Sequence, residues 1–231
     1  MKKPGITERD KLANWEKLLA HAAILQTKVP GAVLVGDTAA ALHVRHRYSL
    51  DHDHVLENLA ENYPKVTREL ESIVGWRTNC RIKDKLVLGR VDRIDAGLRN
   101  RRRSAPLDTI VVVLSGGAHL TVPTVEEMLR IKAFLIVDRN ATRDYLDVAA
   151  LSYYLGLKKS AAALEPMNEL YAQFAGEGGD MITSVVVSLT SPTPYDLTEV
   201  NLAEYKGIIK PWNEWHAVEQ QCAALAVASL N

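Results

Sequence analysis

Two acidic residues separated by a single position are the part of this sequence best suited to chemistry. Asp51 and Asp53 follow the segment VLVGDTAAALHVRHRYSL in a chain of 231 residues. If residues 50–55 form a strand, both side chains point to the same face, because side chains alternate along a strand. Two carboxylates on one face repel each other unless a cation lies between them. The spacing therefore indicates a site for a divalent cation.

A divalent ion held by two carboxylates suits phosphoryl-type transfer. Mg²⁺, or Mn²⁺ in its place, binds carboxylate and phosphate oxygens and neutralises the charge that develops during transfer. The alternative interpretation of Asp51 and Asp53 is a polar loop of solvated acids. Histidines also occur nearby, at positions 43, 46, 52 and 54. Their spacing does not match a closed tetrahedral zinc site, so we expect His52 and His54 on the strand face opposite the aspartates.

Both helices and strands are predicted around these acids. Residues 8–28 have apolar positions at helical spacing and are followed by Pro30-Gly31. Residues 32–36 read as a short buried strand that ends in a glycine. A helix over 38–46 follows, with Thr38 as a candidate N-cap, and a second helix is expected over about 56–74.

The middle of the chain is rich in strand signals. We expect strands at 85–91 and 94–99 joined by a tight turn at 92–93, then a strand at 107–114 and a hairpin partner at 119–123. This succession indicates a partly antiparallel sheet.

The remainder of the chain reads as helical. Thr124 begins a capping-box pattern that opens a helix, a second helix is expected over 142–155, and a last one follows Pro211. Glycines 176, 178 and 179 interrupt the pattern without the strand context of a phosphate loop. We expect an α/β core over 1–123 and a mainly helical region over 124–231.

The ordered combination of motifs resembles the nucleotidyltransferase superfamily with the DNA polymerase β-like fold, and within it the abortive-infection and toxin-like members. That family has a strand, a glycine with a small residue, a helix, and then Arg-x-Ser-x-Asp-x-Asp. The matching segments here are Gly36-Asp37-Thr38-Ala39 and Arg47-Tyr48-Ser49-Leu50-Asp51-His52-Asp53. A later lysine, arginine and Asp-x-x-Asp helix are matched by Lys132, Arg139, Arg143-Asp144 and Asp147.

The resemblance implies an α+β fold with a mixed sheet, and transfer of a nucleoside monophosphate from an NTP to an RNA, protein or small-molecule acceptor. It implies that Asp51 and Asp53 hold Mg²⁺ or Mn²⁺ with a third carboxylate from a later strand. Asp95 and Asp108 compete for that place, and we prefer Asp95. The nucleotide-binding positions it implies are Gly36, Asp37, Thr38, Ser49 and Lys132. A lysine that extends to the rim of the core is the structural alternative for Lys132.

Asp37 departs from the family pattern, which has a small residue there. A carboxylate at this position repels a phosphate unless it binds a cation or turns away. A catalytically degenerate member that binds a nucleotide or a protein partner is therefore the alternative function. An unrelated mixed α/β domain with incidental acids is the third reading.

Charge and composition restrict the partners. The net charge is zero, but residues 77–103 carry ten Lys and Arg against three Asp, whereas residues 161–231 carry two Lys against nine Asp and Glu. The basic block indicates either a local anionic partner or a solvated face. Its arginines at 99, 101, 102 and 103 are candidate contacts to a phosphate or an acceptor, and we expect 101–103 to be exposed.

Hydropathy and cysteine content indicate the cellular compartment of the protein. There is no apolar run of the roughly 20 residues that a membrane helix needs, and the N-terminal segment lacks the apolar core of a secretory signal. Two cysteines cannot make a disulfide framework, so we expect a cytoplasmic protein with reduced thiols. RNA, an NTP or a cognate antitoxin protein are the expected partners, and a membrane is not.

Overall fold

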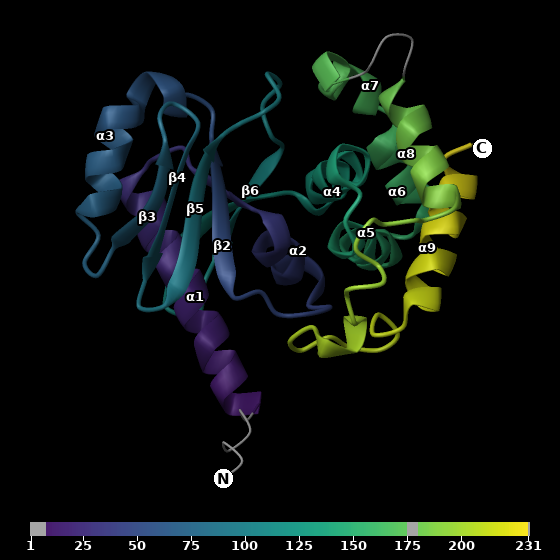
Figure 1. Cartoon of the computed structure of the whole chain (residues 1–231), viewed down its shortest axis with the longest axis horizontal. Coiled ribbons are helices and arrows are strands. Elements are labelled where there is room, and N and C mark those ends of the chain that lie inside the picture. The colour runs from purple at the N-terminus through teal and green to yellow at the C-terminus, as the bar shows by residue number, and fades with distance from the viewer. Residues whose placement is uncertain (1–7, 175–179, 231) are drawn as a thin grey trace. The chain divides into compact units, whose positions relative to one another are not determined.

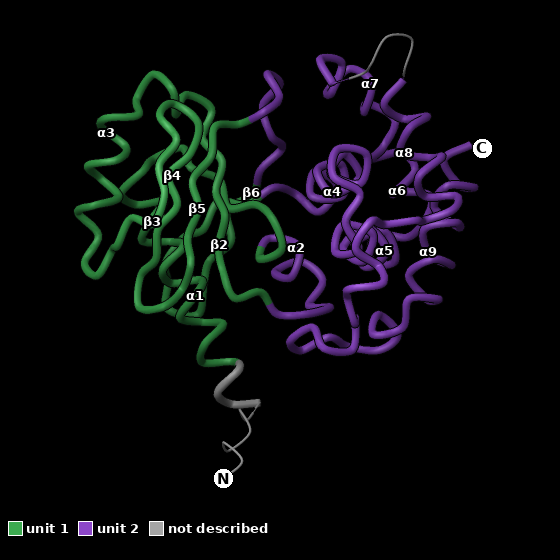
Figure 2. Tube along the Cα trace, in the orientation of Figure 1, with its two compact units in different colours: residues 1–38, 49–101, 110–122 green, residues 39–48, 102–109, 123–231 purple. Residues whose placement is uncertain are grey.

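The computed structural model describes residues 8–174 and 180–230, which form two compact units (Figures 1 and 2). Unit 1 comprises residues 1–38, 49–101 and 110–122, and unit 2 comprises residues 39–48, 102–109 and 123–231. The longest segment of unit 2 begins at residue 123. Two earlier segments, 39–48 and 102–109, also belong to the helical unit. Glycines 176, 178 and 179 lie outside the described residues.

Unit 1 is built on a five-stranded mixed sheet with the strand order β1-β2-β5-β4-β3. The strands are β1 (Val33–Val35), β2 (Asp51–Leu56), β3 (Arg77–Ile82), β4 (Leu86–Val91) and β5 (Ile94–Asn100). β2 and β5 run parallel, whereas the other neighbouring pairs are antiparallel. The expected partly antiparallel sheet is thus confirmed.

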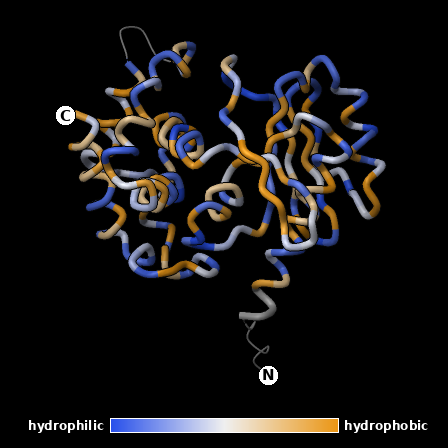
Figure 3. The backbone as a smooth tube through the Cα atoms, turned by 180° about the vertical axis from the view of Figure 1, so that it is seen from behind, coloured by the Kyte–Doolittle hydropathy of each residue, from blue (hydrophilic) through white to orange (hydrophobic). Residues whose placement is uncertain are grey.

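Helices α1 (Glu8–Lys28) and α3 (Leu59–Glu71) cover one face of this sheet (Figure 1). Their apolar side chains pack on those of the strands, and Figure 3 shows how apolar residues follow the strands. Burial of such side chains is the main stabilising contribution to a core of this kind. The residues of this cluster are Leu25, Val29, Ala32, Leu56, Leu59, Tyr63, Val66, Leu70, Ile73, Val87, Val91 and Leu98.

The turn between β4 and β5 is as tight as the sequence predicts. Asp92 and Arg93 both have positive φ, at 49° and 72°, which is the conformation that a two-residue hairpin requires. No strand was expected at β3, because its residues are mostly polar and almost all of them are exposed. It is an edge strand, so it lacks the apolar alternation by which strands are recognised.

A separate two-stranded ribbon is formed by β6 (Thr109–Val113) and β7 (His119–Pro123), the hairpin expected at 107–114 and 119–123. Between β1 and β2 lies α2 (Gly36–Val44), which begins in unit 1 and continues into unit 2. The expected N-cap role of Thr38 is wrong, because the helix already begins at Gly36. The Thr38 hydroxyl instead donates to the backbone carbonyl of Asp51.

Unit 2 is helical. Its helices are α4 (Val125–Arg139), α5 (Thr142–Leu155), α6 (Leu157–Leu164), α7 (Met167–Leu170), α8 (Met181–Thr190) and α9 (Trp215–Ala228), with short 3₁₀ turns at Ala172–Phe174 and Leu202–Glu204. Thr124 caps α4 by accepting from the Glu127 amide, which confirms the expected beginning of the helix. The reciprocal bond of a capping box is not formed, because the Thr124 amide donates to the Asp108 carbonyl. Asn140 ends α4 in the left-handed conformation, and Gly156 ends α5.

Candidate functional site

Strand β2 separates its acidic and imidazole side chains onto opposite faces of the sheet. His52 and His54 are buried, whereas Asp51 is exposed and Asp53 is half-exposed. This alternation confirms the expectation that the histidines lie opposite the aspartates. Because α1 and α3 cover the histidine face, the two carboxylates are left on the uncovered face of the sheet in unit 1.

Strand β5 brings a third carboxylate to that face. In the parallel pairing of β2 with β5, Asp51 stands opposite Asp95 and Asp53 stands opposite Gly97. Paired residues of neighbouring strands point to the same face, so Asp95 joins Asp51 there. The Asp95 carboxylate also lies 3.1 Å from the guanidinium of Arg90 on β4. The competing Asp108 belongs to unit 2, where its carboxylate pairs with Arg130.

Gly97 is a feature of this face that the sequence analysis missed. A Cβ atom at Gly97 would overlap Oδ1 of Asp53 and lie 3.3 Å from the Leu88 side chain. The missing side chain therefore makes room for the Asp53 carboxylate. Arg99, two residues further along β5, lies 3.9 Å from the same Asp53 oxygen. A strand-interior glycine is the signal that could have indicated this close approach.

The start of α2 lies beside the acidic pair. Gly36 has a φ of +73°, a conformation that favours glycine, and a Cβ built there would lie 3.7 Å from the Cβ of Asp53. Asp37 follows in the first turn of α2 and is half-buried. A negative charge is favourable at a helix N-terminus, which gives Asp37 a structural reason to be there.

Two hydroxyl groups hold the beginning of β2 in place. The Ser49 hydroxyl donates to Oδ1 of Asp51 at 2.8 Å, and the Thr38 hydroxyl donates to the Asp51 carbonyl. Ser49 and Thr38 were both expected at the nucleotide. The structure shows them ordering Asp51, so their positions in the motif have a function within the chain itself.

The carboxylate oxygens on this face supply some of the ligands that a magnesium or manganese ion needs. Asp51 and Asp53 present carboxylate oxygens on the same side of one strand, and Mg²⁺ is usually held by one or two carboxylates together with water and phosphate oxygens. Within residues 8–174 and 180–230, no three His, Cys, Asp or Glu side chains gather as a ready-made metal cage. The two aspartates thus fit an ion whose remaining ligands come from a substrate.

The arginines at 99–103 have different surroundings. Arg101 pairs with Glu57 at 2.6 Å, and Arg102 pairs with Asp138 at 2.6 Å while it stacks on Phe134 and Phe174. Arg103 is 4% exposed and lies 2.8 Å from the buried Glu127. The expectation that residues 101–103 are exposed is therefore wrong for Arg103 and for Arg101, whose side chain is only 10% exposed, and it holds for Arg102. The charge of Arg103 is compensated by a carboxylate from α4, which is what makes the burial of a guanidinium affordable.

Lys132 lies in a buried charge network of unit 2 (the Asp147 network). Its ammonium group is fully buried, 2.5 Å from Asp147 and 3.4 Å from Asp144. The alternative of a lysine extending to the rim of the core is wrong, because two carboxylates hold the ammonium group inside. Asp144 is also bound by Arg139 at 2.6 Å.

Asp147 is the centre of this network. It accepts from Arg47 Nε and Nη2 at 3.0 Å each and lies 2.7 Å from Nε2 of His46. Burial alone would raise the pKa of Asp147, but Arg47, Lys132 and His46 hold it well below its ordinary value. The network therefore connects the arginine of the Arg-x-Ser-x-Asp-x-Asp segment to the later lysine and Asp-x-x-Asp helix. His46 was not singled out in the sequence for this role.

Comparison with solved structures identifies the fold. The chain matches JHP933 from Helicobacter pylori with a TM-score of 0.53 and 18% identity over 98% of this chain and 94% of that one. A further solved structure from H. pylori, described as a nucleotidyltransferase, gives a TM-score of 0.53 with 96% of each chain covered and 18% identity. The antibiotic-resistance factor ANT(2'')-Ia gives 0.51 with 13% identity over 73% of this chain and 96% of its own. The fold is that of the nucleotidyltransferases, an α+β core with a mixed sheet and a helical C-terminal part.

Sequence comparison adds a different likeness. The chain is 35% identical over 142 residues to the heme uptake protein MmpL11 of Mycobacterium tuberculosis, and 28% identical over 164 residues to the mycolic acid-containing lipids exporter MmpL11 of Mycolicibacterium smegmatis. It spans only 14% and 16% of the length of these proteins. No family model matches the chain. Among the described residues, none of the helices has the length and apolar character needed to cross a bilayer.

Proposed function

We propose that this protein is a metal-dependent nucleotidyltransferase that transfers a nucleoside monophosphate from an NTP to an acceptor and releases pyrophosphate. The observation that carries the proposal is the acidic face of unit 1. Asp51 and Asp53 share one side of β2, and Asp95 stands in register with Asp51 on the parallel strand β5. The nucleotidyltransferase fold supports this assignment, and so does the beginning of α2 beside Asp53.

Each residue then has a defined role. Asp51 and Asp53 hold Mg²⁺ or Mn²⁺, which supplies charge neutralisation at the phosphates when bound. Asp95 accepts the proton of the acceptor hydroxyl. The acceptor oxygen forms a bond to the α-phosphorus, the bond from that phosphorus to the bridging oxygen of the β-phosphate breaks, and pyrophosphate leaves with the electron pair. Ser49 keeps the Asp51 carboxylate oriented through its 2.8 Å hydrogen bond.

The beginning of α2 is the natural place for the phosphates. Gly36 lets the backbone turn into the helix next to Asp53, and the amide groups of a first helical turn favour anions. Asp37 works against this because its carboxylate lies in the same first turn. An ion or a basic side chain has to compensate it when the triphosphate arrives.

The proposal also covers the subtype of the enzyme, its acceptor and its protein partner. The toxin-like subtype is supported by the sequence order Arg47, Ser49, Asp51, Asp53 and by the contact of Arg47 with Asp147. An RNA acceptor is supported by Arg99, which lies on the acidic face, half-exposed and near Asp53. A cognate antitoxin is the protein partner that this subtype implies.

The test is transfer of label from α-phosphate-labelled NTPs. Each of the four NTPs is incubated with Mg²⁺ or Mn²⁺ and with total RNA, a protein lysate or a small-molecule fraction. We expect label in one fraction, its loss in Asp51→Asn with Asp53→Asn, and a strong reduction in Asp95→Asn. Asp108→Asn is the matched control, since this exposed carboxylate pairs with Arg130. Nucleotide binding without transfer to any fraction would instead favour the degenerate alternative.

A further inference from the structure

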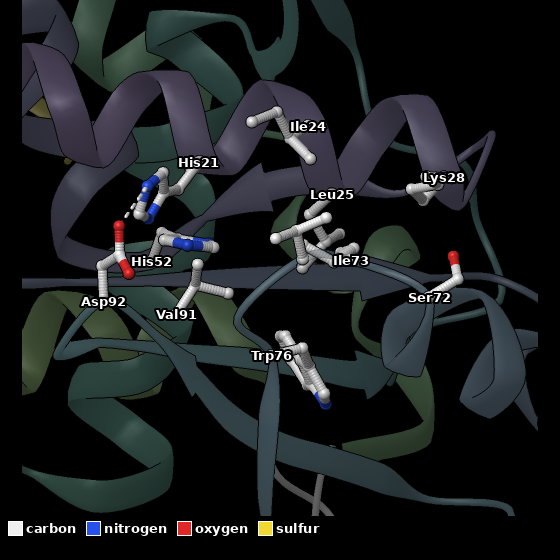
Figure 4. A pocket seen from close by; sticks show the side chains of 11 residues that line it. His21, Ile24, Leu25, Lys28, His52, Ser72, Ile73, Trp76, Val91 and Asp92 are labelled. Atoms are coloured by element: carbon white, nitrogen blue, oxygen red, sulfur yellow. Dashed lines mark ion pairs between the residues drawn. The ribbon is translucent and has the colours of Figure 1, made fainter.

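Unit 1 contains a pocket of about 280 Å³ on the face of the sheet opposite the aspartates (Figure 4). It lies under one face of α1, where His21, Ile24, Leu25 and Lys28 follow one another at helical spacing. From His21 to Lys28 the helix rises by about 10 Å, or two turns. The pocket is therefore elongated along α1, and its size suits a ligand smaller than most drug molecules.

Polar groups lie at the two ends of this pocket and apolar groups lie between them. Figure 4 shows His21, His52 and Asp92 at one end and Lys28 with Ser72 at the other. The middle is lined by Ile24, Leu25, Ile73, Trp76 and Val91. The Trp76 indole nitrogen already donates to Thr78 at 2.9 Å, so the Trp76 ring offers the pocket its apolar surface.

The imidazole of His52 is the feature that indicates a ligand. His52 is 2% exposed, and neither of its ring nitrogens has a hydrogen-bond partner among the described residues. Buried polar groups in folded proteins are nearly always hydrogen-bonded. An imidazole nitrogen can exchange a hydrogen bond with a hydroxyl group, which is both a donor and an acceptor.

The charges at the two ends set the orientation of a ligand. At the His52 end, the Asp92 carboxylate lies 3.1 Å from Lys17 and 4.0 Å from His21. A second anion there would be repelled by Asp92. At the other end, no carboxylate among the described residues pairs with the Lys28 ammonium group. An anionic group therefore fits at Lys28, and an uncharged polar group fits at His52.

We propose that this pocket binds a small carboxylic acid that carries an aromatic ring and an uncharged hydroxyl group on the side of the ring away from the carboxylate. The carboxylate pairs with Lys28, the ring packs against Trp76, Leu25 and Ile73, and the hydroxyl meets His52. This site is separate from the acidic face, because His52 and the aspartates point to opposite sides of β2. The inference therefore does not depend on the proposed transferase activity.

The experiment compares three probes by calorimetry on the full chain at pH 7.5. The probes are 3-(4-hydroxyphenyl)propanoate, 3-phenylpropanoate, which lacks the hydroxyl, and 4-ethylphenol, which lacks the carboxylate. We expect the hydroxy acid to bind, and loss of either polar group to weaken binding by about tenfold, the effect of one hydrogen bond or ion pair. The indole N–H resonance of Trp76, assigned with Trp76→Phe, should shift on binding.

Two lysine variants test where the carboxylate of the ligand binds. Lys28→Gln should weaken binding of the hydroxy acid by about tenfold and leave 4-ethylphenol unchanged. Lys65→Gln, an exposed lysine on α3 outside the pocket, is the matched control and should behave as the wild type. Both lysines are exposed, so these variants should fold. Equal binding of all three probes, equal affinity in Lys28→Gln, or no binding of the hydroxy acid would overturn the proposal.

Discussion

Gly97 on β5 stands directly opposite Asp53 on β2, and the space that a side chain at Gly97 would fill is taken by the Asp53 carboxylate. The position of a candidate metal ligand thus depends on a neighbour that has no side chain. Glycine in a strand weakens the strand, so its presence at Gly97 is accounted for by the close approach of Asp53.

Gly97→Ala should displace the Asp53 carboxylate and reduce nucleotide transfer by about a hundredfold, because small misplacements of a reacting group have effects of this size. Thermal unfolding should change far less than activity. Gly116→Ala is the control, since a Cβ there meets nothing within 4 Å and its backbone is not in the left-handed region. Full activity in Gly97→Ala would contradict the importance of this contact.

Replacement of Asp51 and Asp53 together by alanine should abolish binding of Mg²⁺ or Mn²⁺. The two carboxylates lie on one side of β2 and repel each other until a cation lies between them. Calorimetric titration with and without NTP measures the loss. Asp95→Asn, tested in parallel, should weaken metal binding less than the double variant. If the double variant binds the ion as the wild type does, the ligands are elsewhere.

Asp37→Ser should tighten NTP binding by about 1–3 kcal/mol, the scale of one close repulsion removed. The same change should lower the free energy of unfolding by about 0.3–1 kcal/mol, because an acid in the first turn of α2 interacts favourably with the helix dipole. Equilibrium nucleotide binding and urea unfolding separate the two effects. If the wild type is active and Asp37→Ser is impaired, Asp37 is itself a ligand in the nucleotide site.

Arg103→Gln should destabilise unit 2 by about 1–3 kcal/mol, because the buried Glu127 loses the arginine on one of its oxygens and keeps only Arg130 on the other. Arg102→Gln should cost about 1 kcal/mol or less, since its pair with Asp138 is solvent-accessible. Urea unfolding distinguishes them. If RNA is the acceptor, RNA binding at low salt should fall in Arg102→Gln and Arg99→Gln without loss of folding. Equal losses of unfolding free energy in Arg102→Gln and Arg103→Gln would contradict the assignment of Arg103 to a buried ion pair and Arg102 to an exposed one.

Acidification should destabilise unit 1 through His52. Its pKa is about 4 in the folded protein and near 6.5 when unfolded, so the unfolded chain takes up the proton first. Stability is complete above pH 6.5 and is lost as the pH falls toward 4. Between pH 7.5 and 5.0 we expect His52 to contribute a loss of about 2 kcal/mol.

The measurement for His52 is urea unfolding of the wild type and His52→Gln at both pH values. His54 and His21, whose pKa values are also lowered, act in the same direction in both proteins, so the difference isolates His52. An identical pH dependence in the two proteins would show that His52 does not titrate as its burial requires.

Much of the local structure and the outline of the site could be predicted from the sequence. Helical periodicity predicted α1, the Thr124 capping pattern predicted the beginning of α4, and the Asp-x-Asp spacing predicted that Asp51 and Asp53 share a face. These features depend on interactions between residues near one another in the chain. Periodicity and capping are therefore visible without a tertiary structure.

Tertiary structure alone decided which distant residues meet. The parallel register of β2 and β5 set Asp95 beside Asp51 and Gly97 beside Asp53, and the packing of α4 brought Glu127 to Arg103. The same holds for Lys132, which a helical pattern could not distinguish from a surface lysine until Asp147 and Asp144 were found around it. A charge is buried only where an opposite charge from elsewhere in the fold compensates its desolvation, and spacing along the chain does not report that.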